Sequence, residues 1–184
     1  MNYKDYKNTR DLVWKILAQE KINELPVSVS ELCRSMVISM RLYESTDGNS
    51  GKSLIIDEKP VIFVNRVDSP ERQRFTAAHE LGHIMLGHVG KYHLVNREPS
   101  KSDNPIEQAA NVFASRLLSP ACVLWGCNAH TATDISNLCK ISAQAAEYRA
   151  ERMKILYDRN AFLTSSLECE VYENFKRYIE THKL

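Results

Sequence analysis

Apolar residues near the amino terminus recur at the spacing of an amphipathic helix. One face of this segment carries Leu12, Val13, Ile16 and Leu17. The spacing predicts a first helix over about residues 5–20. Ser28 followed by Glu31 has the pattern of a capping box, in which the two side chains bond each other's backbone N–H groups. We therefore expect a second helix that begins after Ser28 and runs toward Met36.

The pattern then changes to short runs that are typical of strands. Three such runs occupy residues 40–44, 53–57 and 61–65. Turn-forming clusters separate them at residues 47–51 and at Glu58-Lys59-Pro60. Strands that follow one another across short turns pair most simply in opposite directions. These runs therefore predict a small antiparallel sheet.

Helical signals return after the third run. Ser69-Pro70-Glu71 supplies an N-cap, a proline at the first helical position and an acid in the first turn. The helix that begins there is expected to end near Gly87, because glycine readily follows a helix end. Residues 91–104 are polar and are expected to form a loop. Pro105 then opens a further helix, which Ser119-Pro120 ends.

The last part of the chain has a helical pattern. Residues 134–139, a break at residues 140–142 and a helix from Ala143 predict a pair that looks like a helix-turn-helix. A final amphipathic helix is expected to carry Val171, Phe175, Tyr178 and Ile179. The order of helices, small sheet and further helices is typical of an α+β fold.

Composition narrows the classes of protein that fit. The chain has 184 residues, of which 43% are hydrophobic, enough for one main core and at most a small appendage. Its 24 basic and 23 acidic residues leave a net charge of +1, which argues against a dominant nucleic-acid or membrane-surface role. No run approaches the roughly 20 apolar residues that span a bilayer. The first residues also lack the apolar run of a secretory signal.

The number and spacing of the cysteines indicate a reducing compartment. The chain contains Cys33, Cys122, Cys127, Cys139 and Cys169. This is an odd number without a C-x-x-C pair, so small buried thiols in a reducing environment are expected. A zinc site made from Cys122 and Cys127 lacks the usual spacing. We therefore expect a cytoplasmic protein.

One short motif carries metal chemistry. His79-Glu80-Leu81-Gly82-His83 lies within the helix predicted after Ser69 and has the form H-E-x-x-H. Residues four apart differ by about 40° around a helix axis, so both imidazoles can bind one zinc ion. Glu80 lies beside the pair, where it can act as the general base toward a water molecule. The alternative is two surface histidines on an ordinary helix, but the apolar flanks indicate a buried one.

A third ligand is needed to complete such a site. Glu107 lies in the first turn of the helix opened by Pro105, among residues that are otherwise small or apolar. It is the candidate third ligand, although an acid at this position also stabilises a helix N-terminus. Asn111, one turn later, can accept a hydrogen bond from the free N–H of a ligating histidine and orient its ring.

The sequence assigns no single role to several other polar residues. Gly87 and His88 are out of step with the extended motif H-E-x-x-H-x-x-G-x-x-H, so His88 is expected in a loop. Tyr92, His93 and His130 all remain candidates for stabilising a developing oxyanion.

Two blocks of the sequence resemble the ImmA/IrrE family of metallopeptidases. The first spans residues 65–83 and contains the H-E-x-x-H motif, and the second, residues 107–120, reads EQAANVFASRLLSP. The resemblance covers about residues 25–155. It implies a gluzincin-like fold, zinc on the two motif histidines and the matched Glu107, and a bacterial or mobile-element origin. It also implies that the substrates are repressors with helix-turn-helix domains. Larger members carry a further sensory-type domain, which this sequence is expected to lack.

Three functional hypotheses follow. The first is a site-specific zinc endopeptidase that cleaves a helix-turn-helix repressor to relieve repression, with a catalytic domain over residues 1–125 and a helical region over residues 126–184. The second is a non-proteolytic regulator that uses the metal-site fold to bind a partner protein or DNA. Glu80 argues against it, because a binding module needs no general base. The third, an aminopeptidase, lacks a visible device that grips a free amine.

Two further expectations concern binding surfaces. The substrate is expected to add as a strand to the predicted sheet, at residues 61–65 or 53–57. DNA binding is not expected from the helix-turn-helix-like pair. Its second helix has three basic residues against two acids over residues 143–154, which is too small an excess to neutralise many phosphates.

Overall fold

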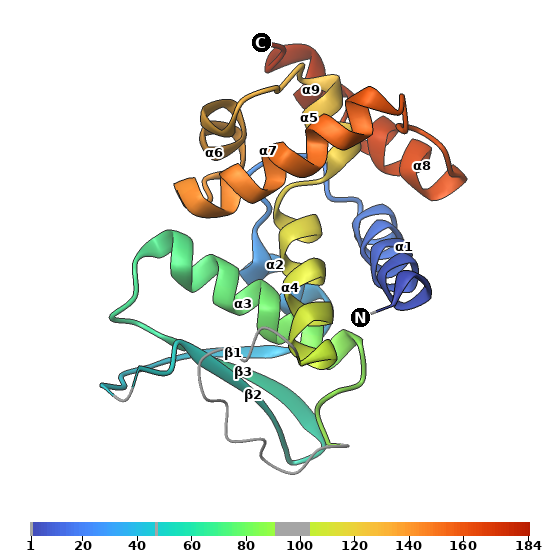
Figure 1. Ribbon diagram of the computed structural model, residues 1–184. Coiled ribbons are helices and arrows are strands. Elements are labelled where there is room, and N and C mark those ends of the chain that lie inside the picture. The colour runs from blue at the N-terminus through green and yellow to red at the C-terminus, as the bar shows by residue number, and fades with distance from the viewer. Residues whose placement is uncertain (1, 47, 91–103) are drawn as a thin grey trace. The chain divides into compact units, whose positions relative to one another are not determined.

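The computed structural model describes residues 2–46, 48–90 and 104–184 (Figure 1). Its helices are α1 (Tyr3–Gln19), α2 (Val29–Ser35), α3 (Pro70–Met85), α4 (Pro105–Leu118), α5 (Ala121–Gly126), α6 (Ala132–Cys139), α7 (Ala143–Asp158), α8 (Ser166–Asn174) and α9 (Lys176–Thr181). Its strands are β1 (Ser39–Tyr43), β2 (Gly51–Ile56) and β3 (Lys59–Asn65). Helices around one small sheet confirm the α+β class.

The chain forms two compact units. The first comprises Met1–Thr9 and Ser28–Ala114, and the second comprises Arg10–Val27 and Ser115–Leu184. The sheet, α2, α3 and most of α4 belong to the first unit, and α5 to α9 belong to the second. The expected division into a catalytic domain over residues 1–125 and a helical region over residues 126–184 stays a prediction.

The sheet of the first unit is mixed. Its strand order is β1-β3-β2, with β2 antiparallel and β1 parallel to β3. The chain reverses between β1 and β2 and again between β2 and β3, so β1 and β3 run the same way. Because β2 occupies one side of β3, β1 pairs on the other, from Ser39 opposite Val61 to Tyr43 opposite Asn65. The expectation of an antiparallel sheet was right for the hairpin and wrong for β1.

The Asn65 side chain fixes the connection between β1 and β2. It is buried, and its Nδ2 donates to the carbonyl oxygens of Ser45 at 2.9 Å and Asn49 at 3.1 Å. Its Oδ1 accepts the backbone N–H of Val67 at 3.2 Å. These bonds hold the connection against the end of β3, so that β2 enters the sheet on the side opposite β1.

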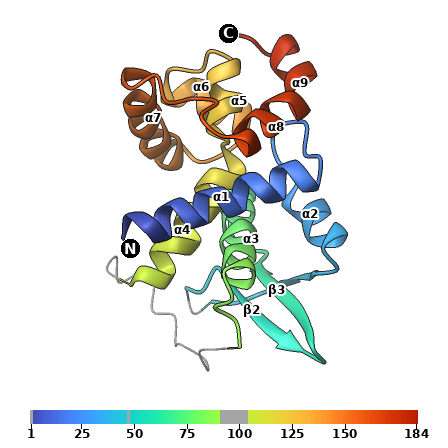
Figure 2. The same cartoon turned by 90° about the vertical axis from the view of Figure 1, so that its right-hand side faces the viewer.

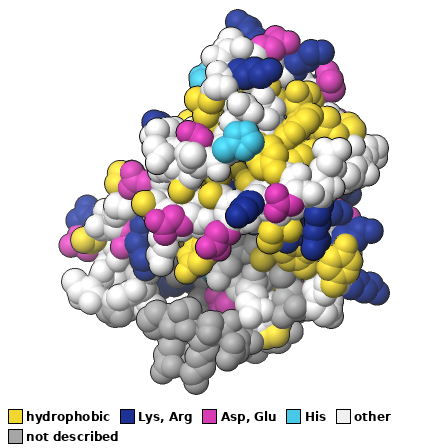
Figure 3. Space-filling view, turned by 45° about the horizontal axis from the view of Figure 1, so that its top comes forward, with side chains coloured by type: hydrophobic (Ala, Val, Ile, Leu, Met, Phe, Trp, Pro, Cys, Tyr) yellow, Lys and Arg dark blue, Asp and Glu magenta, His cyan; other side chains and the backbone are white. Residues whose placement is uncertain are grey.

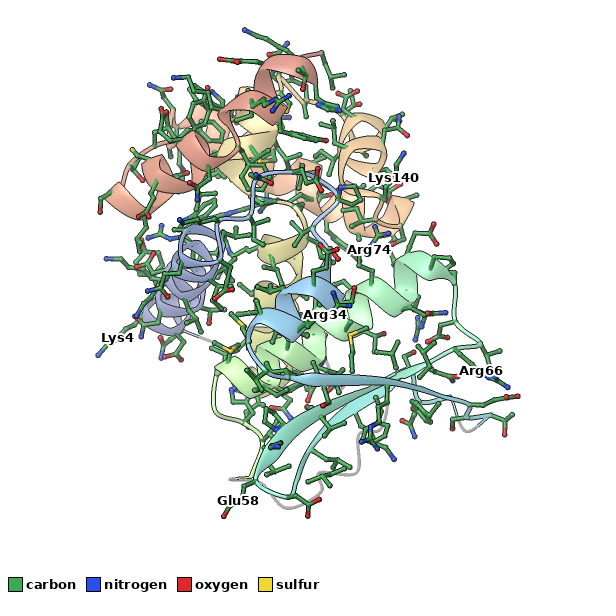
Figure 4. The ribbon with its side chains drawn as sticks, turned by 180° about the vertical axis from the view of Figure 1, so that it is seen from behind. Lys4, Arg34, Glu58, Arg66, Arg74 and Lys140 are labelled. Atoms are coloured by element: carbon green, nitrogen blue, oxygen red, sulfur yellow. The ribbon has the colours of Figure 1, made fainter. Side chains whose placement is uncertain are left out.

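A two-residue turn joins β2 to β3. Asp57 and Glu58 have φ values of 49° and 62°, the left-handed conformation of the type I′ turns that suit hairpins. Glu58 lies at the tip of this hairpin (Figure 4). The turn therefore lies one residue earlier than the expected Glu58-Lys59-Pro60, and Pro60 belongs to β3. Its missing N–H is tolerated because β1 pairs with β3 only from Val61 onward.

Helix α3 begins where the sequence signals place it and lies across one face of the sheet. The Ser69 hydroxyl oxygen accepts the Arg72 N–H at 3.3 Å, and Pro70 is the first helical residue. The helix contacts both β2 and β3 (Figure 1, Figure 2). Its most deeply buried apolar residues are Ala77, Ala78 and Leu81. The motif helix is therefore part of the core, as its apolar flanks indicate.

Helix α4 begins at Pro105, as expected, and approaches α3 closely. A Cβ atom at Gly82 of α3 would lie 3.0 Å from Cδ1 of Phe113, whose side chain is fully buried on α4. A larger residue than glycine would push the Phe113 ring away. The close approach therefore brings α4 against the C-terminal half of α3.

The second unit contains the expected helix pair. The Thr131 hydroxyl oxygen accepts the Asp134 N–H while the Asp134 carboxylate accepts the Thr131 N–H, so a capping box opens α6. Lys140 follows α6 with a left-handed φ of 52°, and Ser142 caps α7. Helices α6 and α7 pack against each other. The predicted break at residues 140–142 is confirmed.

The final helix is divided in two. Helices α8 and α9 meet at Phe175, whose φ of −88° and ψ of 0° depart from α-helical values. Val171, Phe175 and Ile179 are all buried, as their spacing predicts, but one continuous helix was the wrong expectation. In the described part of the chain, no helix has both the length and the apolar character to cross a membrane.

Four of the five cysteines are buried, as expected, and Cys169 is exposed. Burial raises the pKa of the Cys33 thiol to about 12 and that of the Cys127 thiol to about 11. These thiols therefore stay protonated at neutral pH, which makes them weak nucleophiles and weak metal ligands.

Candidate metal centre

The two motif histidines project from one face of α3. Their ring centroids are 4.7 Å apart and their Nε2 atoms are 3.0 Å apart. His83 is almost fully buried, at 1% exposed, whereas 15% of the His79 side chain is exposed. A spacing of four residues on a helix therefore directs two imidazole nitrogens toward one position.

Glu107, in the first turn of α4, reaches the same position. Its Oε2 lies 3.1 Å from Nε2 of His79, and its Oε1 lies 3.4 Å from Nε2 of His83. The neighbouring imidazoles of His79 and His83 lower the pKa of the Glu107 carboxyl well below its usual range. The carboxylate is therefore ionised at neutral pH and can serve as an anionic ligand.

Asn111, one turn further along α4, contacts the outer nitrogen of His79. Its Oδ1 lies 2.9 Å from Nδ1 of His79. An amide oxygen only accepts hydrogen bonds, so Nδ1 carries the proton and Nε2 presents a lone pair. Asn111 therefore fixes the tautomer and the ring orientation that a metal ligand needs. This is the contact that the sequence analysis proposed for it.

The donor atoms lie close to the spacing of a tetrahedral divalent-cation site. Atoms about 2.0–2.2 Å from such an ion lie roughly 3.3–3.6 Å from one another. The separations among the donor atoms of His79, His83 and Glu107 are 3.0, 3.1 and 3.4 Å, so two are slightly shorter than this range and one falls within it. The unprotonated Nε2 of His79 also faces a carboxylate oxygen, an arrangement that a cation between them stabilises. Their role as metal ligands stays a prediction.

Glu80, between the two histidines in sequence, turns its carboxylate toward β2. It is only 2% exposed, and its Oε2 accepts the Ser53 hydroxyl at 2.7 Å. A buried carboxylate on the same helix as the two imidazoles, one residue from His79, is a candidate to accept and return a proton. Ser53 was not among the residues predicted from the sequence. Its one signal was a hydroxyl next to the apolar run Leu54-Ile55-Ile56 of β2, and the sequence does not show which residue that hydroxyl contacts.

His88 follows the end of α3, and its side chain lies against His83. Gly87 has φ of 70°, and the His88 N–H donates to the His83 carbonyl oxygen at 2.8 Å, as in a Schellman motif. The Nδ1 atoms of His88 and His83 are 3.0 Å apart. His88 therefore lies in a loop, as expected, but it also contacts the outer nitrogen of a candidate ligand. The glycine that ends the helix was the sequence signal that could have indicated this contact between His88 and His83.

The three candidates for an oxyanion-stabilising residue remain open. Tyr92 and His93 lie outside the described residues. His130 belongs to the second unit, where its ring stacks on Tyr157 with centroids 4.4 Å apart and its Nε2 lies 3.0 Å from Oδ1 of Asn128.

The fold and the site together define the class of protein to which this chain is similar. A buried helix with the H-E-x-x-H motif lies against a small sheet, and a later helix supplies a carboxylate to the same position. This is the arrangement of metallopeptidases that bind their metal through two histidines and a glutamate.

Comparison with known proteins identifies the family. Residues 37–151 match the model of the peptidase family described as the IrrE N-terminal-like domain, and the chain belongs to this family. It is 32% identical over 102 residues to the radiation response metalloprotease IrrE of Deinococcus radiodurans, a match that covers 50% of this chain and 30% of that protein. It is 34% identical over 107 residues to the protein of the same name from Deinococcus deserti, covering 52% of this chain and 37% of the relative. The chain thus matches about a third of the length of each relative.

Proposed function

We propose that this protein is a zinc-dependent, site-specific endopeptidase. The observation that carries the proposal is the convergence of His79, His83 and Glu107, with the buried Glu80 between the two histidines in the same helix. Two imidazoles and one carboxylate close to tetrahedral spacing favour zinc among the divalent ions. When bound, the ion supplies a Lewis acid that polarises the scissile carbonyl and makes water a better nucleophile.

The residues of the chain have separate tasks in this proposal. Glu80 takes a proton from the attacking water and passes it to the amine of the leaving peptide. Asn111 keeps Nε2 of His79 directed at the ion, through its 2.9 Å contact with Nδ1. The low exposure of Glu80 and His83 limits competition from bulk water for these groups.

The proposed substrate is a helix-turn-helix repressor in the cytoplasm. The two Deinococcus relatives are named as radiation response metalloproteases, and cleavage of a repressor is a direct way for a protease to start a response. The resemblance of residues 65–83 and 107–120 to the ImmA/IrrE family supports the same substrate class. A gene for such a repressor beside the gene for this protein would further support it.

Of the two edge strands of the described sheet, β1 and β2, we take β2 as the one at which an extended substrate can add, because its Ser53 contacts Glu80. Strand β3 is paired on both sides, whereas β2 pairs with β3 alone among the described strands. The Asn65 N–H donates to the Ser50 carbonyl, and hydrogen-bonded pairs alternate along an antiparallel ladder. Counted from this pair, Gly51, Ser53 and Ile55 occupy the other type of pair. Their N–H and C=O groups therefore point away from β3 and can pair with a peptide strand.

The proposal is tested by cleavage of an internally quenched peptide library with zinc-loaded protein. We expect cleavage at a restricted set of sequences, loss of activity when a chelator removes the zinc, and recovery when zinc is restored. Zinc-loaded protein that cleaves neither the library nor any helix-turn-helix repressor offered to it would overturn the proposal.

Ile55→Pro is expected to lower kcat/KM by about fivefold or more, because it removes an N–H that would donate to the substrate. Ile55 is 48% exposed and lies opposite Pro60, so the substitution removes no bond of the β2–β3 ladder. The measurement is cleavage of the best library peptide, with zinc content and thermal unfolding recorded for each variant. Ile55→Ala is the matched control, since it shortens the side chain and keeps the N–H. Equal losses in both variants would contradict substrate binding at this edge.

Binding to DNA is the alternative function that the structure supports least. Arg149 of α7 is buried, and its guanidinium donates to the Ser119 carbonyl at 2.5 Å within the second unit. Because its side chain is buried, it is not available to contact a phosphate. Acidic and basic side chains are interspersed over the face shown in Figure 3. Helix α7 therefore offers even less positive charge than its composition indicates.

We expect the chain to show no DNA affinity that rises steeply as salt is lowered. The reason is that such affinity comes from the neutralisation of several phosphates by exposed cations. Fluorescence anisotropy with a labelled duplex, at salt concentrations from about 50 to 200 mM, measures it. Micromolar or tighter binding with a steep salt dependence would favour the regulator hypothesis over the peptidase.

A further inference from the structure

Ser53 faces two parts of the site at once. Its hydroxyl donates to Oε2 of Glu80 at 2.7 Å, and the two residues are 5% and 2% exposed. Its backbone N–H and C=O point to the open edge of β2, because its pair with Ile62 is a non-hydrogen-bonded one. One residue thus links the edge that would receive a substrate strand to the carboxylate that would receive a proton.

The contact depends on the close approach of β2 to α3. A Cβ atom at Gly51 would overlap Cγ2 of Thr76 and would lie 3.6 Å from Cγ of Glu80. Glycine therefore lets the strand lie against the helix at this point. Two residues later along the strand, the side chain again points to α3, and there it is the Ser53 hydroxyl. The strand geometry thus directs this hydroxyl at Glu80.

A hydrogen bond of this kind restricts the carboxylate. The terminal torsion of a glutamate side chain has a broad energy profile, so packing alone fixes its plane poorly. Hydrogen bonds to an ionised acceptor are roughly twice as strong as those between neutral groups. The Ser53 hydroxyl therefore holds the plane of the buried Glu80 carboxylate.

We propose that Ser53 is a positioning residue that sets the orientation of Glu80 relative to a substrate strand bound along β2. The proposal rests on the peptidase function proposed above. A substrate residue opposite Ser53 would exchange two backbone hydrogen bonds with it. The same residue would then set both the register of the substrate and the plane of the general base. The scissile peptide bond and the Glu80 carboxylate would therefore hold a fixed position relative to each other.

The first test compares Ser53→Ala with Ser53→Thr in the zinc-loaded, full-length protein. Ser53→Ala is expected to lower kcat for the best library peptide by about 10- to 100-fold, the usual cost of losing a hydrogen bond to a charged group. KM is expected to change less than about threefold, because the backbone groups of residue 53 remain. Ser53→Thr, which keeps a hydroxyl, is expected to restore most of kcat.

Ser50→Ala is the matched control. It removes a hydroxyl three residues away, whose oxygen accepts from Nε of Arg72 on the exposed surface. Kinetic constants close to those of the wild type are expected, with the zinc content of every variant unchanged. Equal effects of Ser53→Ala and Ser50→Ala would overturn the proposal, as would an effect of Ser53→Ala on KM alone.

The second test needs no substrate. Acetohydroxamate binds zinc and gives its proton to a neighbouring base, and it is too small to span the β2 edge. Ser53→Ala is expected to raise the Kd of acetohydroxamate about tenfold in the zinc-loaded protein and less than about twofold in the Glu80→Gln background, because the effect passes through Glu80.

Absence of peptide cleavage by the wild type would overturn the peptidase proposal. An equal effect of Ser53→Ala in both backgrounds, or none in either, would overturn the role of Ser53 alone.

Discussion

Glu80→Gln is expected to lower peptide cleavage by about 10²- to 10⁴-fold, which is the usual contribution of a general base. Glutamine has nearly the same volume, and its amide oxygen can still accept the Ser53 hydroxyl, so the fold is expected to persist. The amide cannot take a proton from water at neutral pH. Zinc content is expected to stay at about one ion per chain, because Glu80 is not among the three candidate ligands.

The measurement is cleavage of the best library peptide, together with elemental analysis and thermal unfolding of each variant. Glu71→Gln is the matched control, because Glu71 lies in the first turn of the same helix and is fully exposed. Its cleavage rate is expected to match that of the wild type. A Glu80→Gln protein that cleaves at the normal rate would remove Glu80 from the mechanism. One that cannot cleave but complements the biological function fully would show that the protein works by binding.

His79→Ala is expected to abolish stable zinc binding, and cleavage with it. The substitution leaves one imidazole and one carboxylate where three donors converge. It also leaves Asn111 without the Nδ1–H that it accepts. The loss of affinity is expected to exceed the roughly 10- to 100-fold that removal of an outer hydrogen bond to a ligand costs. Wild-type protein purified without chelator is expected to hold about one zinc ion per chain.

Elemental analysis and competition with a chromogenic chelator measure this effect at neutral pH, since metal is lost when the ligands are protonated. His182→Ala is the matched control, because His182 is exposed near the carboxyl terminus and belongs to the second unit. Its zinc content is expected to equal that of the wild type. Equal zinc contents in His79→Ala and the wild type would show that the ligand assignment is wrong.

The local signals in the sequence predicted most of the helices and the residues that meet at the candidate site. The Ser69 cap and the Pro70 start place α3 correctly, and the spacing of His79 and His83 follows from the helix period alone. Pro105 predicts the start of α4 in the same way. These features depend on bonds between residues that are three or four apart, so a short window of sequence contains the information.

Contacts between distant segments were harder to predict. The parallel pairing of β1 with β3 joins residues about twenty positions apart, and short strands carry little information about the direction of a partner. The hydrogen bond between Ser53 and Glu80 spans 27 residues. His88 was assigned to a loop correctly, but its contact with His83 depends on the left-handed conformation of Gly87.

The sequence by itself determined the chemistry that this protein has available: two imidazoles at helical spacing, a carboxylate between them and a second carboxylate at the start of a later helix. The tertiary structure decided how these groups meet. The absence of a side chain at Gly82 lets α4 approach α3 through Phe113, so that Glu107 and Asn111 reach opposite sides of His79. The close packing of β2 on α3 brings a hydroxyl to the buried Glu80. Helix periodicity is a local property of the chain, whereas these approaches depend on which side chains fill the space between elements, and only the packed fold determines that.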